Sequence, residues 1–366
     1  MLTTVHKPTD VRIFYREAKS LVSAGFSVCI LGPNKGAAQV EGIRIYPLAE
    51  SSNRIHRLLL GWMAVKTALR LRGKLYIFHD PELIGAGLVL RCFGKKVVFD
   101  CHENVHLQIL QKRYIPRPIR WLAIGPLWIT LWIASRLFTG NIAATESILK
   151  RIPKRRSVLI RNYAPASALH DASKDLPVTL RKNIFIYAGG LTQDRGIAEL
   201  QQAFRGLTDM NAELWLVGDF DDRRFREQIL ETLPPNVKWL GSQPFPVVMR
   251  LLREAKIGVV LLHDTPNHRQ GFPLKLFEYL GAGLPVIASN LPQLTPIMEG
   301  CGFQVDPRDV GEIRGALRSI LSDDAVLLAM SKTARERTRK SYMWEDEGER
   351  LVQFCRELIS ADNVRH

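Results

Sequence analysis

The stretch GFPLKLFEYLGAGLPVIAS, from Gly271 to Ser289, predicts a glycine turn, a helix and a buried strand in quick succession. Gly271 lets the backbone approach a ligand closely, and Pro273 suits the first position of a helix. The helix would end at Gly281 and Gly283, before the apolar strand LPVIAS. Because the free amide hydrogens at a helix N-terminus attract anions, this stretch is a candidate phosphate site.

Lys275 and Glu278 lie three residues apart, which places both on one face of the predicted helix. The lysine can reach a phosphate, and the carboxylate can accept hydrogen bonds from both hydroxyls of a ribose. Together with the helix start, the pair suits a nucleoside diphosphate. The alternative is an ordinary buried helix and strand with Lys275 and Glu278 as a surface pair, and spacing alone does not decide between the two.

The composition is that of a folded protein with two domains. The chain has 366 residues, and single hydrophobic cores seldom grow beyond about 250 to 300 residues. Hydrophobic residues make up 46% and charged residues 24%, without repeats or low-complexity tracts. The five cysteines show no C-x-x-C spacing, so reduced thiols in a cytoplasm are expected rather than disulfides or a zinc site.

The formal net charge of +15 implies an acidic partner. Nucleic acid and an anionic membrane surface both qualify. The basic residues alternate with apolar helical stretches rather than with a regular pattern of aromatic residues, which favours the membrane surface over nucleic acid.

An uncharged apolar run, WLAIGPLWITLWIAS from Trp121 to Ser135, follows a cluster of arginines. A transmembrane helix needs about 20 apolar residues, so this run, which contains Pro126, is too short to cross a bilayer. We predict a helix in the membrane interface, with its tryptophans at headgroup depth. The alternative is a buried core helix. The predicted membrane contact consists of Arg113, Arg117, Arg120, Trp121, Trp128 and Trp132.

Strands and helices alternate along the whole chain, which predicts parallel sheets covered by helices on both faces. No signal peptide is visible, and Met1 to His6 are expected to form a short first strand. Asp10 is placed to cap a helix that runs to Gly25. We expect a first domain over residues 1–165, a linker over 166–180, a second domain over 181–340 and a final helix over 341–366.

Polar residues come directly after two of the predicted strands. His79, Asp80 and Glu82 come after KLYIF, and His102 comes after KKVVFDC. Ligands bind at the carboxyl ends of parallel strands, so these side chains are placed for chemistry. For Asp80 a helix cap is an equally good interpretation.

The Gly271 stretch resembles the nucleotide-sugar motif of glycosyltransferase family 4. FIYAGGLTQDRGIAELQQAF resembles the segment that opens the second domain of that family. VHKPTDVRIFYREAKSLVSAGFSV, YIFHDPEL and VVFDCHENV resemble a bacterial branch that makes surface polysaccharides. The resemblance implies the GT-B architecture: two Rossmann-like, doubly wound parallel-sheet domains facing across a cleft, with a C-terminal helix that crosses back to the first domain.

The resemblance also implies roles for individual residues. His102 would contact the donor sugar, although a histidine at a strand end is often structural. Arg195 would hold the leaving diphosphate, unless it is a surface residue at a helix start. Lys275 would supply the second cation, because many relatives carry an arginine where this chain has Gly190. The nucleotide-sugar site would comprise Gly190, Arg195, Gln270, Gly271, Phe272, Pro273, Leu274, Lys275 and Glu278.

The acceptor side is expected to lie in the first domain. His6, Asp10 and Arg12 occupy the loop in which many relatives carry a Gly-Gly pair, so their role by resemblance is loosely defined. The cluster after KLYIF would shape the acceptor side or orient the catalytic histidine. The acceptor-side residues would be His6, Asp10, Arg12, His79, Asp80 and Glu82.

Two features depart from the patterns of related enzymes. Gln270 stands where the family carries the first of two glutamates, so the charge that would support a positive sugar transition state is missing. Asp219 and Asp221 form a D-x-D pattern, but no neighbouring histidine or carboxylate cluster completes a metal shell.

The resemblance implies a retaining glycosyltransferase of the hexosyltransferase type that uses no metal and no cofactor. It would move a sugar from a UDP-sugar or GDP-sugar to a lipid-linked saccharide, as a peripheral protein on the cytoplasmic face of the plasma membrane. The alternative is a catalytically weak or silent sugar-nucleotide-binding relative, to which Gln270 points. A basic nucleic-acid-binding protein is the third hypothesis.

Overall fold

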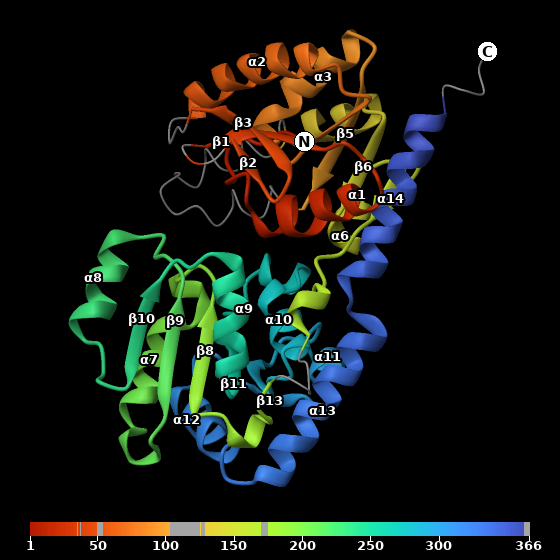
Figure 1. Cartoon of the computed structure of the whole chain (residues 1–366). Coiled ribbons are helices and arrows are strands. Elements are labelled where there is room, and N and C mark those ends of the chain that lie inside the picture. The colour runs from red at the N-terminus through yellow and green to blue at the C-terminus, as the bar shows by residue number, and fades with distance from the viewer. Residues whose placement is uncertain are drawn as a thin grey trace. The chain divides into compact units, whose positions relative to one another are not determined.

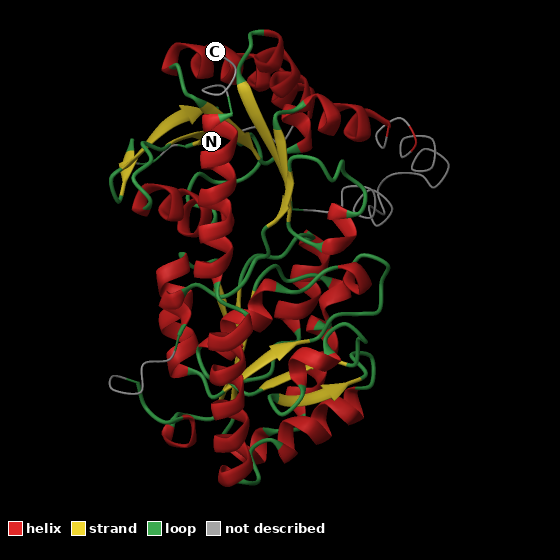
Figure 2. Cartoon of the chain, turned by 90° about the vertical axis from the view of Figure 1, so that its right-hand side faces the viewer, coloured by secondary structure: helices red, strands yellow, loops and turns green. Residues whose placement is uncertain are grey.

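The computed structural model describes residues 1–34, 36, 38–49, 54–102, 125, 129–169 and 175–361. The chain divides into two compact units (Figure 1). Unit 1 comprises Met1–Asn162 together with Trp344–His366, and unit 2 comprises Tyr163–Met343. In both units the strands lie among helices (Figure 2), as the alternation in the sequence predicts.

The sheet of unit 1 has two parts, in the orders β2–β3–β1 and β4–β5–β6–β7. Leu2 forms parallel bridges to both Leu31 and Phe78, so the first residues of the chain join the two parts. The expected N-terminal strand is thus reduced to a bridge. The strands are β1 (Cys29–Pro33), β2 (Gln39–Val40), β3 (Ile43–Leu48), β4 (Leu75–Phe78), β5 (Lys96–Cys101), β6 (Gly140–Ala143) and β7 (Ser157–Leu159).

The first helical segment of unit 1 begins where the sequence predicts. The side chain of Asp10 accepts hydrogen bonds from the amides of Arg12 and Ile13, and the segment ends just before Gly25, which has a φ of +88°. The helical elements are η1 (Val11–Ala18), α1 (Lys19–Ser23), α2 (Arg54–Leu71), η2 (Pro81–Leu83), α3 (Ile84–Cys92), helical residues 129–137, α6 (Glu146–Leu149) and α14 (Trp344–Ser360).

Side chains along β4 alternate between two helical layers. Tyr76 and Phe78 pack against α2, α3 and residues 129–138, whereas Ile77 packs against α14. Lys96 of β5 fixes the end of α14, because its Nζ donates a 2.8 Å hydrogen bond to the carbonyl oxygen of Leu358. The predicted return of the C-terminal helix to the first domain is confirmed.

The sheet of unit 2 has the order β10–β9–β8–β11–β12–β13, and all of its strand pairs are parallel. The chain starts in the middle at β8, moves outward to β10, and then continues from β11 in the other direction. This is the doubly wound order, in which ligands bind where the direction reverses, outside the carboxyl ends of β8 and β11. The strands are β8 (Ile184–Ala188), β9 (Glu213–Val217), β10 (Val237–Gly241), β11 (Ile257–Val260), β12 (Val286–Ser289) and β13 (Gly302–Val305).

Two hydrophobic clusters cover the faces of this sheet. One lies between the sheet and α9 and α10, and the other lies between the sheet and α7 and α12. The helical elements are η3 (Ala166–Ala168), η4 (Val178–Leu180), η5 (Gln193–Arg195), α7 (Ile197–Arg205), η6 (Thr208–Met210), α8 (Arg223–Glu231), α9 (Phe245–Glu254), η7 (His268–Gln270), α10 (Leu274–Gly281), α11 (Thr295–Met298), α12 (Val310–Ser319) and α13 (Asp324–Ser341).

No helix in the described part of the chain combines the length and the apolar character that a membrane span requires. The five cysteines, all of which are described, are free thiols.

Candidate functional site

The turn after β8 and the first turn of α10 form the centre of the candidate site in unit 2. Lys275 and Glu278 of α10 are both buried, with 8% of each residue exposed. The alternative that they form a surface pair is therefore wrong. Burial of two ionisable side chains on one short helix requires a reason beyond packing, because charged groups lose their hydration there.

The ammonium group of Lys275 lies against the backbone of β8. Its Nζ is 3.5 Å from the centre of the Tyr187 ring, and it has no hydrogen-bond partner among the described residues. A Cβ atom on Gly189 would lie 2.8 Å from this nitrogen. Glycine is thus required at position 189, both for this contact and for its φ of +146°.

Arg195 brings a second cation to the same turn. Its Nη1 donates a 3.2 Å hydrogen bond to the carbonyl oxygen of Gly190, to which the Tyr187 hydroxyl also donates, at 2.8 Å. A Cβ atom on Gly190 would lie 3.2 Å from the same Nη1. The absence of a side chain at position 190 therefore leaves room for the guanidinium of Arg195.

The electrostatics of the turn favour an anion. Burial lowers the pKa of Lys275 well below its usual value, and the charge of Arg195 lowers it further, against the attraction of Glu278. Burial also raises the pKa of Tyr187 to about 12, so its hydroxyl stays neutral. A buried cation without a hydrogen-bonded partner costs stability, and an anion bound beside Lys275 and Arg195 would remove that cost.

The start of α10 differs from the prediction in one respect. Pro273 precedes the helix as its N-cap, and the first helical residue is Leu274. Gly271 has an ordinary φ of −118°, and a Cβ atom there would lie 3.6 Å from its nearest neighbour, so other side chains would fit. Phe272 is exposed, and Gln270 ends η7 immediately before this turn.

Two histidines outside the predicted site residues, His263 and His268, connect the elements that carry the site. The Nδ1 of His268 is 2.8 Å from the carbonyl oxygen of His263, and its Nε2 is 3.6 Å from Asp194. The Nε2 of His263 is 2.9 Å from Glu199. These contacts join the end of β11 and η7 to the turn that carries Arg195. Both histidines follow the strand IGVVLL, so the rule that identified His79 and His102 would also have found them.

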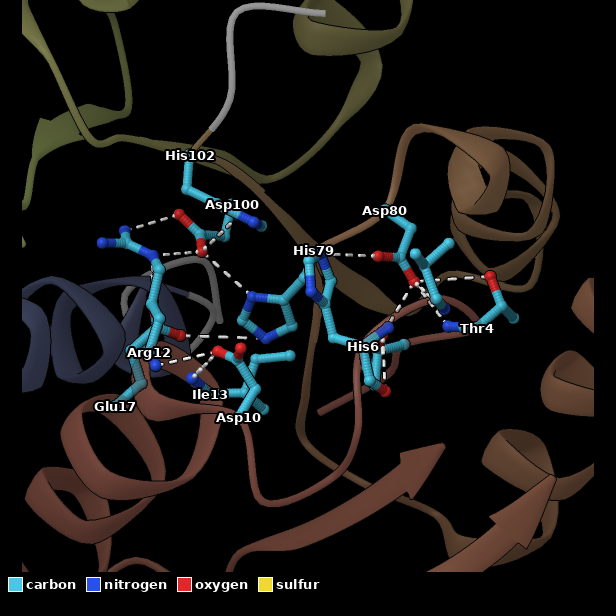
Figure 3. A network of polar contacts seen from close by, with 12 residues as sticks. Thr4, His6, Asp10, Arg12, Ile13, Glu17, His79, Asp80, Asp100 and His102 are labelled. Carbon is cyan, nitrogen blue, oxygen red and sulfur yellow. Dashed lines mark hydrogen bonds and ion pairs between the residues drawn. The ribbon is translucent and has the colours of Figure 1, made fainter. Parts of the chain in front are cut away.

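In unit 1, Asp100 is the centre of a buried polar network (Figure 3). Its two carboxylate oxygens accept hydrogen bonds of 2.7 Å each from Nε and Nη2 of Arg12. Oδ2 is also 2.9 Å from Nδ1 of His79 and 3.4 Å from Nδ1 of His102. The remaining nitrogen of Arg12 donates to Oδ1 of Asn162 at 2.6 Å. The fold brings Arg12, His79 and His102 to one place. For His79 and His102 this was predicted from strand ends, whereas Arg12 was assigned to a loop by resemblance and lies in η1. The sequence analysis did not single out Asp100 or Asn162.

Burial and neighbouring charges shift the pKa values of the ionisable groups in this network. Burial would raise the pKa of Asp100, but Arg12 and the hydrogen bonds to the carboxylate hold that pKa well below its usual value. Burial raises the pKa of Glu17, whose Oε1 lies 3.0 Å from Nε of Arg12, well above its usual value. Burial lowers the pKa of His79. Arg12 and Asp100 therefore form the charged pair at the centre of the network, whereas burial disfavours the charged forms of Glu17 and His79.

Asp80 organises the N-terminal loop rather than a helix. Its Oδ2 accepts hydrogen bonds from Oγ1 of Thr3 at 2.8 Å and from the amide of Thr4, and its Oδ1 is 3.4 Å from Nε2 of His6. The side chain makes no cap hydrogen bond to η2, so the helix-cap interpretation of Asp80 is wrong. The ring of His6 is thereby held 5.2 Å from that of His102.

The other predicted residues of unit 1 have separate positions. Glu82 lies in η2 and is half-buried, and Asp10 serves as the helix cap. Trp132 is 40% exposed, and the Arg136 guanidinium lies 3.2 Å from the centre of its ring. Five predicted membrane contacts lie outside the described residues: Arg113, Arg117, Arg120, Trp121 and Trp128.

The ligand atoms of His79, Asp100 and His102 lie within 4.8 Å of one another, which is a spacing that a metal ion could use. However, both oxygens of Asp100 are already bound by the guanidinium of Arg12, and a hydrogen bond joins Asp100 to His79. A metal ion would have to displace these bonds beside a buried positive charge. The donor set therefore suits a hydrogen-bond network better than a metal centre.

Residues 182–323 match the family model described as Glycosyl transferases group 1. The match covers the greater part of unit 2. The matched range includes the buried lysine, Arg195 and the glycine turn. The predicted resemblance is confirmed, and it places the anion site of unit 2 inside a domain that the family shares.

Relatives extend the comparison. The glycogen synthase of Mycobacterium tuberculosis is 25% identical over 170 residues, which are 44% of this chain and 39% of that protein. The O-antigen chain mannosyltransferase B of Escherichia coli is 25% identical over 223 residues, which are 58% of this chain and 52% of that protein. The chain thus spans about two fifths to half the length of these curated relatives.

The fold is shared with solved glycosyltransferase structures over nearly the whole chain. Anabaena Alr3699/HepE, solved in complex with UDP-glucose, superposes with a TM-score of 0.73 at 14% identity, and the match covers 97% of this chain and 98% of that one. The predicted GT-B fold class is confirmed.

We predict that Asp100→Asn destabilises the protein by about 3 to 5 kcal/mol, because it leaves the Arg12 guanidinium buried without a counter-charge. The measurement is the free energy of unfolding in urea. Glu146→Gln is the matched control, because that carboxylate also pairs with an arginine, Arg161, but is 65% exposed. Its expected cost is about 0.5 kcal/mol or less. Equal effects of the two variants would contradict the structural role of Asp100.

We predict that Lys275→Met stabilises the ligand-free protein by about 1 kcal/mol or more, because it removes a buried cation that lacks a hydrogen-bond partner. Since folding lowers the pKa of Lys275 from 10.5, the folded chain binds fewer protons, and wild-type stability should rise with pH up to about 10.5. The advantage of the variant should therefore shrink as the pH rises from 7 to 10. Lys332→Met, at a side chain that is 72% exposed, is the control. Destabilisation by Lys275→Met would contradict the assigned charge state.

Proposed function

We propose that the protein is a retaining glycosyltransferase that works without a metal ion or cofactor. It moves a sugar from a UDP-sugar or GDP-sugar to a lipid-linked saccharide in the synthesis of a bacterial surface polysaccharide. The observation that carries this proposal is the buried Lys275, which has no hydrogen-bond partner among the described residues and lies beside Arg195 at the carboxyl end of β8. Within a glycosyltransferase domain, that site suits the diphosphate of a donor.

Lys275 and Arg195 would hold the two phosphates, and the amides of the first turn of α10 would complete the anion site. The carboxylate of Glu278, which is three residues further along this helix, would accept hydrogen bonds from the ribose hydroxyls. The charge of the diphosphate increases as the bond to the sugar breaks. The two cations therefore stabilise the transition state more than the bound donor, which is the requirement for catalysis.

In the retaining reaction, the bond between the anomeric carbon and the phosphate oxygen breaks while the acceptor oxygen bonds to the same face of that carbon. The acceptor's proton passes to the departing phosphate oxygen, so no protein base is required. His102 would contact the donor sugar. The contact of 3.4 Å with Asp100 favours a proton on Nδ1 of His102, which fixes the tautomer of the ring.

The relatives support this choice of substrates. One of them is named as an O-antigen chain mannosyltransferase, and a solved structure of the same fold holds UDP-glucose. Two side-chain cations at the phosphate site and the engagement of Asp100 by Arg12 support a reaction without metal. The second candidate is a weak or silent sugar-nucleotide-binding relative, because Gln270 stands where the family carries a glutamate.

The proposal places the protein on the cytoplasmic face of the plasma membrane. Support comes from the net charge of +15 and from the exposed Trp132 beside Arg136. The experiment for the proposed activity is incubation of the pure protein with a panel of labelled nucleotide sugars. We expect hydrolysis or transfer with one UDP-sugar or GDP-sugar. Tight binding without turnover would favour the silent relative, and inertness toward the whole panel would contradict both.

We predict that Glu278→Ala lowers the affinity for the nucleoside diphosphate by about 100-fold or more. Two charge-assisted hydrogen bonds of about 1.5 to 3 kcal/mol each would be lost together. Calorimetric titration with UDP and GDP measures this affinity. Circular dichroism shows whether the variant is folded, and unchanged affinity in a folded variant would remove Glu278 from the ribose site.

We predict that activity survives a strong chelator, because side chains and helix amides neutralise the phosphates. The assay is the turnover of the active donor with and without EDTA. Loss of turnover that Mg²⁺ or Mn²⁺ restores would instead assign a metal. Further variants of Asp219 and of His79 would then show which cluster holds it.

A further inference from the structure

We propose that unit 1 binds an anionic lipid bilayer through the outer face of one helical layer. This layer consists of α2, α3 and residues 129–138. The proposal rests on the proposed membrane location and specifies the surface that makes the contact. It extends the contact from the segment Trp121–Ser135 that the sequence indicates, which shares residues 129–135 with the layer, to α2 and α3, which are separate along the chain.

The three helices of the layer lie side by side. A Cβ atom on Gly61 of α2 would lie 3.7 Å from Leu83 and 3.9 Å from Ala86, next to α3. A Cβ atom on Gly87 of α3 would lie 3.0 Å from Phe138. Figure 1 shows α2 and α3 adjacent in unit 1. The inner face of the layer packs on β4 and β5, so its outer face is directed away from the sheet.

The outer face of α2 is apolar. Leu59, Trp62 and Met63 are 59%, 63% and 57% exposed, and their spacing places them on one side of the helix. Their neighbours Leu60 and Ala64 are buried in the core of unit 1. Large side chains that are exposed as a group are unusual on a monomeric protein, and such patches mark binding surfaces.

The third helix repeats this arrangement. Ile129, Ile133 and Leu137 are 52%, 46% and 52% exposed, and with Trp132 they form a stripe at helical spacing. On the opposite side of the same helix, Ala134 is 1% exposed. The two helices therefore each have a buried face toward the sheet and a second apolar face toward solvent. The hypothesis of a simple core helix explains only the buried face.

The charge of the layer favours an anionic partner. Neither α2, α3 nor residues 129–138 contain an aspartate or glutamate. Lys66 and Arg70 are exposed on α2, and Arg91 and Arg136 lie on the other two helices. Exposed apolar side chains on α13 have a different setting, because Asp324 and Glu336 lie on that helix beside its basic residues. A layer with basic residues and no acidic residue is complementary to anionic lipid headgroups.

Tryptophan is also a residue type that is enriched at membrane–water interfaces. Trp62 and Trp132 are amphipathic rings at exposed positions, and the Arg136 guanidinium lies over the Trp132 ring. In this arrangement the rings would enter the headgroup region while the guanidinium stays near the phosphates. A protein partner would be expected to offer the layer some carboxylates of its own, and a second copy of this layer would bring like charges together.

The test is co-sedimentation of the full chain with vesicles. We expect binding to vesicles of phosphatidylcholine and phosphatidylglycerol, partial release in high salt, and weak binding to phosphatidylcholine alone. Lys66→Ala with Arg70→Ala should weaken binding about 30-fold, from about 1 kcal/mol for each charge. Leu59→Ser with Trp62→Ser and Met63→Ser should weaken it about 100-fold or more.

The matched controls are on α13, where the side chains are exposed to a similar extent. Val326→Ser with Leu328→Ser and Lys332→Ala with Lys340→Ala should bind vesicles like the wild type. Unfolding by the α2 triple variant would show that its side chains are core, and would overturn the proposal. Equal binding to neutral vesicles, or binding that the α2 variants leave unchanged, would also overturn it. The proposal would also be overturned if the wild-type chain is a dimer and the α2 variants are monomers.

The test of vesicle binding is independent of the test of the proposed glycosyltransferase reaction. Donor hydrolysis by the α2 variants, measured without vesicles, should equal that of the wild type. Failure of vesicle binding with active donor hydrolysis would refute this surface alone. Vesicle binding without any donor turnover would instead refute the proposed reaction.

Discussion

The two basic side chains at the turn after β8, Lys275 and Arg195, are the feature on which the candidate site of unit 2 depends. Lys275 has its ammonium between the Tyr187 ring and the backbone of Gly189, and Arg195 binds the carbonyl oxygen of Gly190. Two cations close to one buried turn repel each other and lose hydration. A bound anion would relieve both costs, which is the basis for proposing a diphosphate site here.

The geometry of the sheet makes this arrangement possible. A Cβ atom on Gly218, after β9, would lie 2.0 Å from the carbonyl oxygen of Gly189, so the turns that follow β8 and β9 are in close contact. The doubly wound order then places α10, with its buried lysine, beside the end of β8. Unit 1 differs, because the Arg12 guanidinium and the Asp100 carboxylate are paired and burial raises the pKa of Glu17. The network in unit 1 therefore positions His102 and His6, whereas the charge in unit 2 remains for a ligand.

Much of this could be predicted from the sequence, because the signals were local. The helix over Leu274–Gly281 and the polar residues after β4 and β5 follow from composition at strand and helix ends, whereas the glycine turn before Arg195 was identified by family resemblance. Tyr187 could not be predicted, since a tyrosine in an apolar strand looks like any core residue. Asp100 and Glu17 were also missed. The role of Asp100 depends on a contact across 88 residues of chain, and the pKa of Glu17 is raised by burial and by the distant Asp100. The exposed apolar face of α2 could not be predicted for a related reason, because only the packing of the layer shows which side of a hydrophobic helix is exposed.

The most direct test of the diphosphate site is a calorimetric comparison of UDP with UMP, and of GDP with GMP, for the wild type and Lys275→Met. We predict that the wild type binds one of the diphosphates at least about tenfold more tightly than its monophosphate, and that the variant loses this preference together with most of its affinity. Lys332→Met should behave like the wild type. A folded Lys275→Met variant that binds the diphosphate as tightly as the wild type would contradict the assignment of the buried lysine to the donor phosphates.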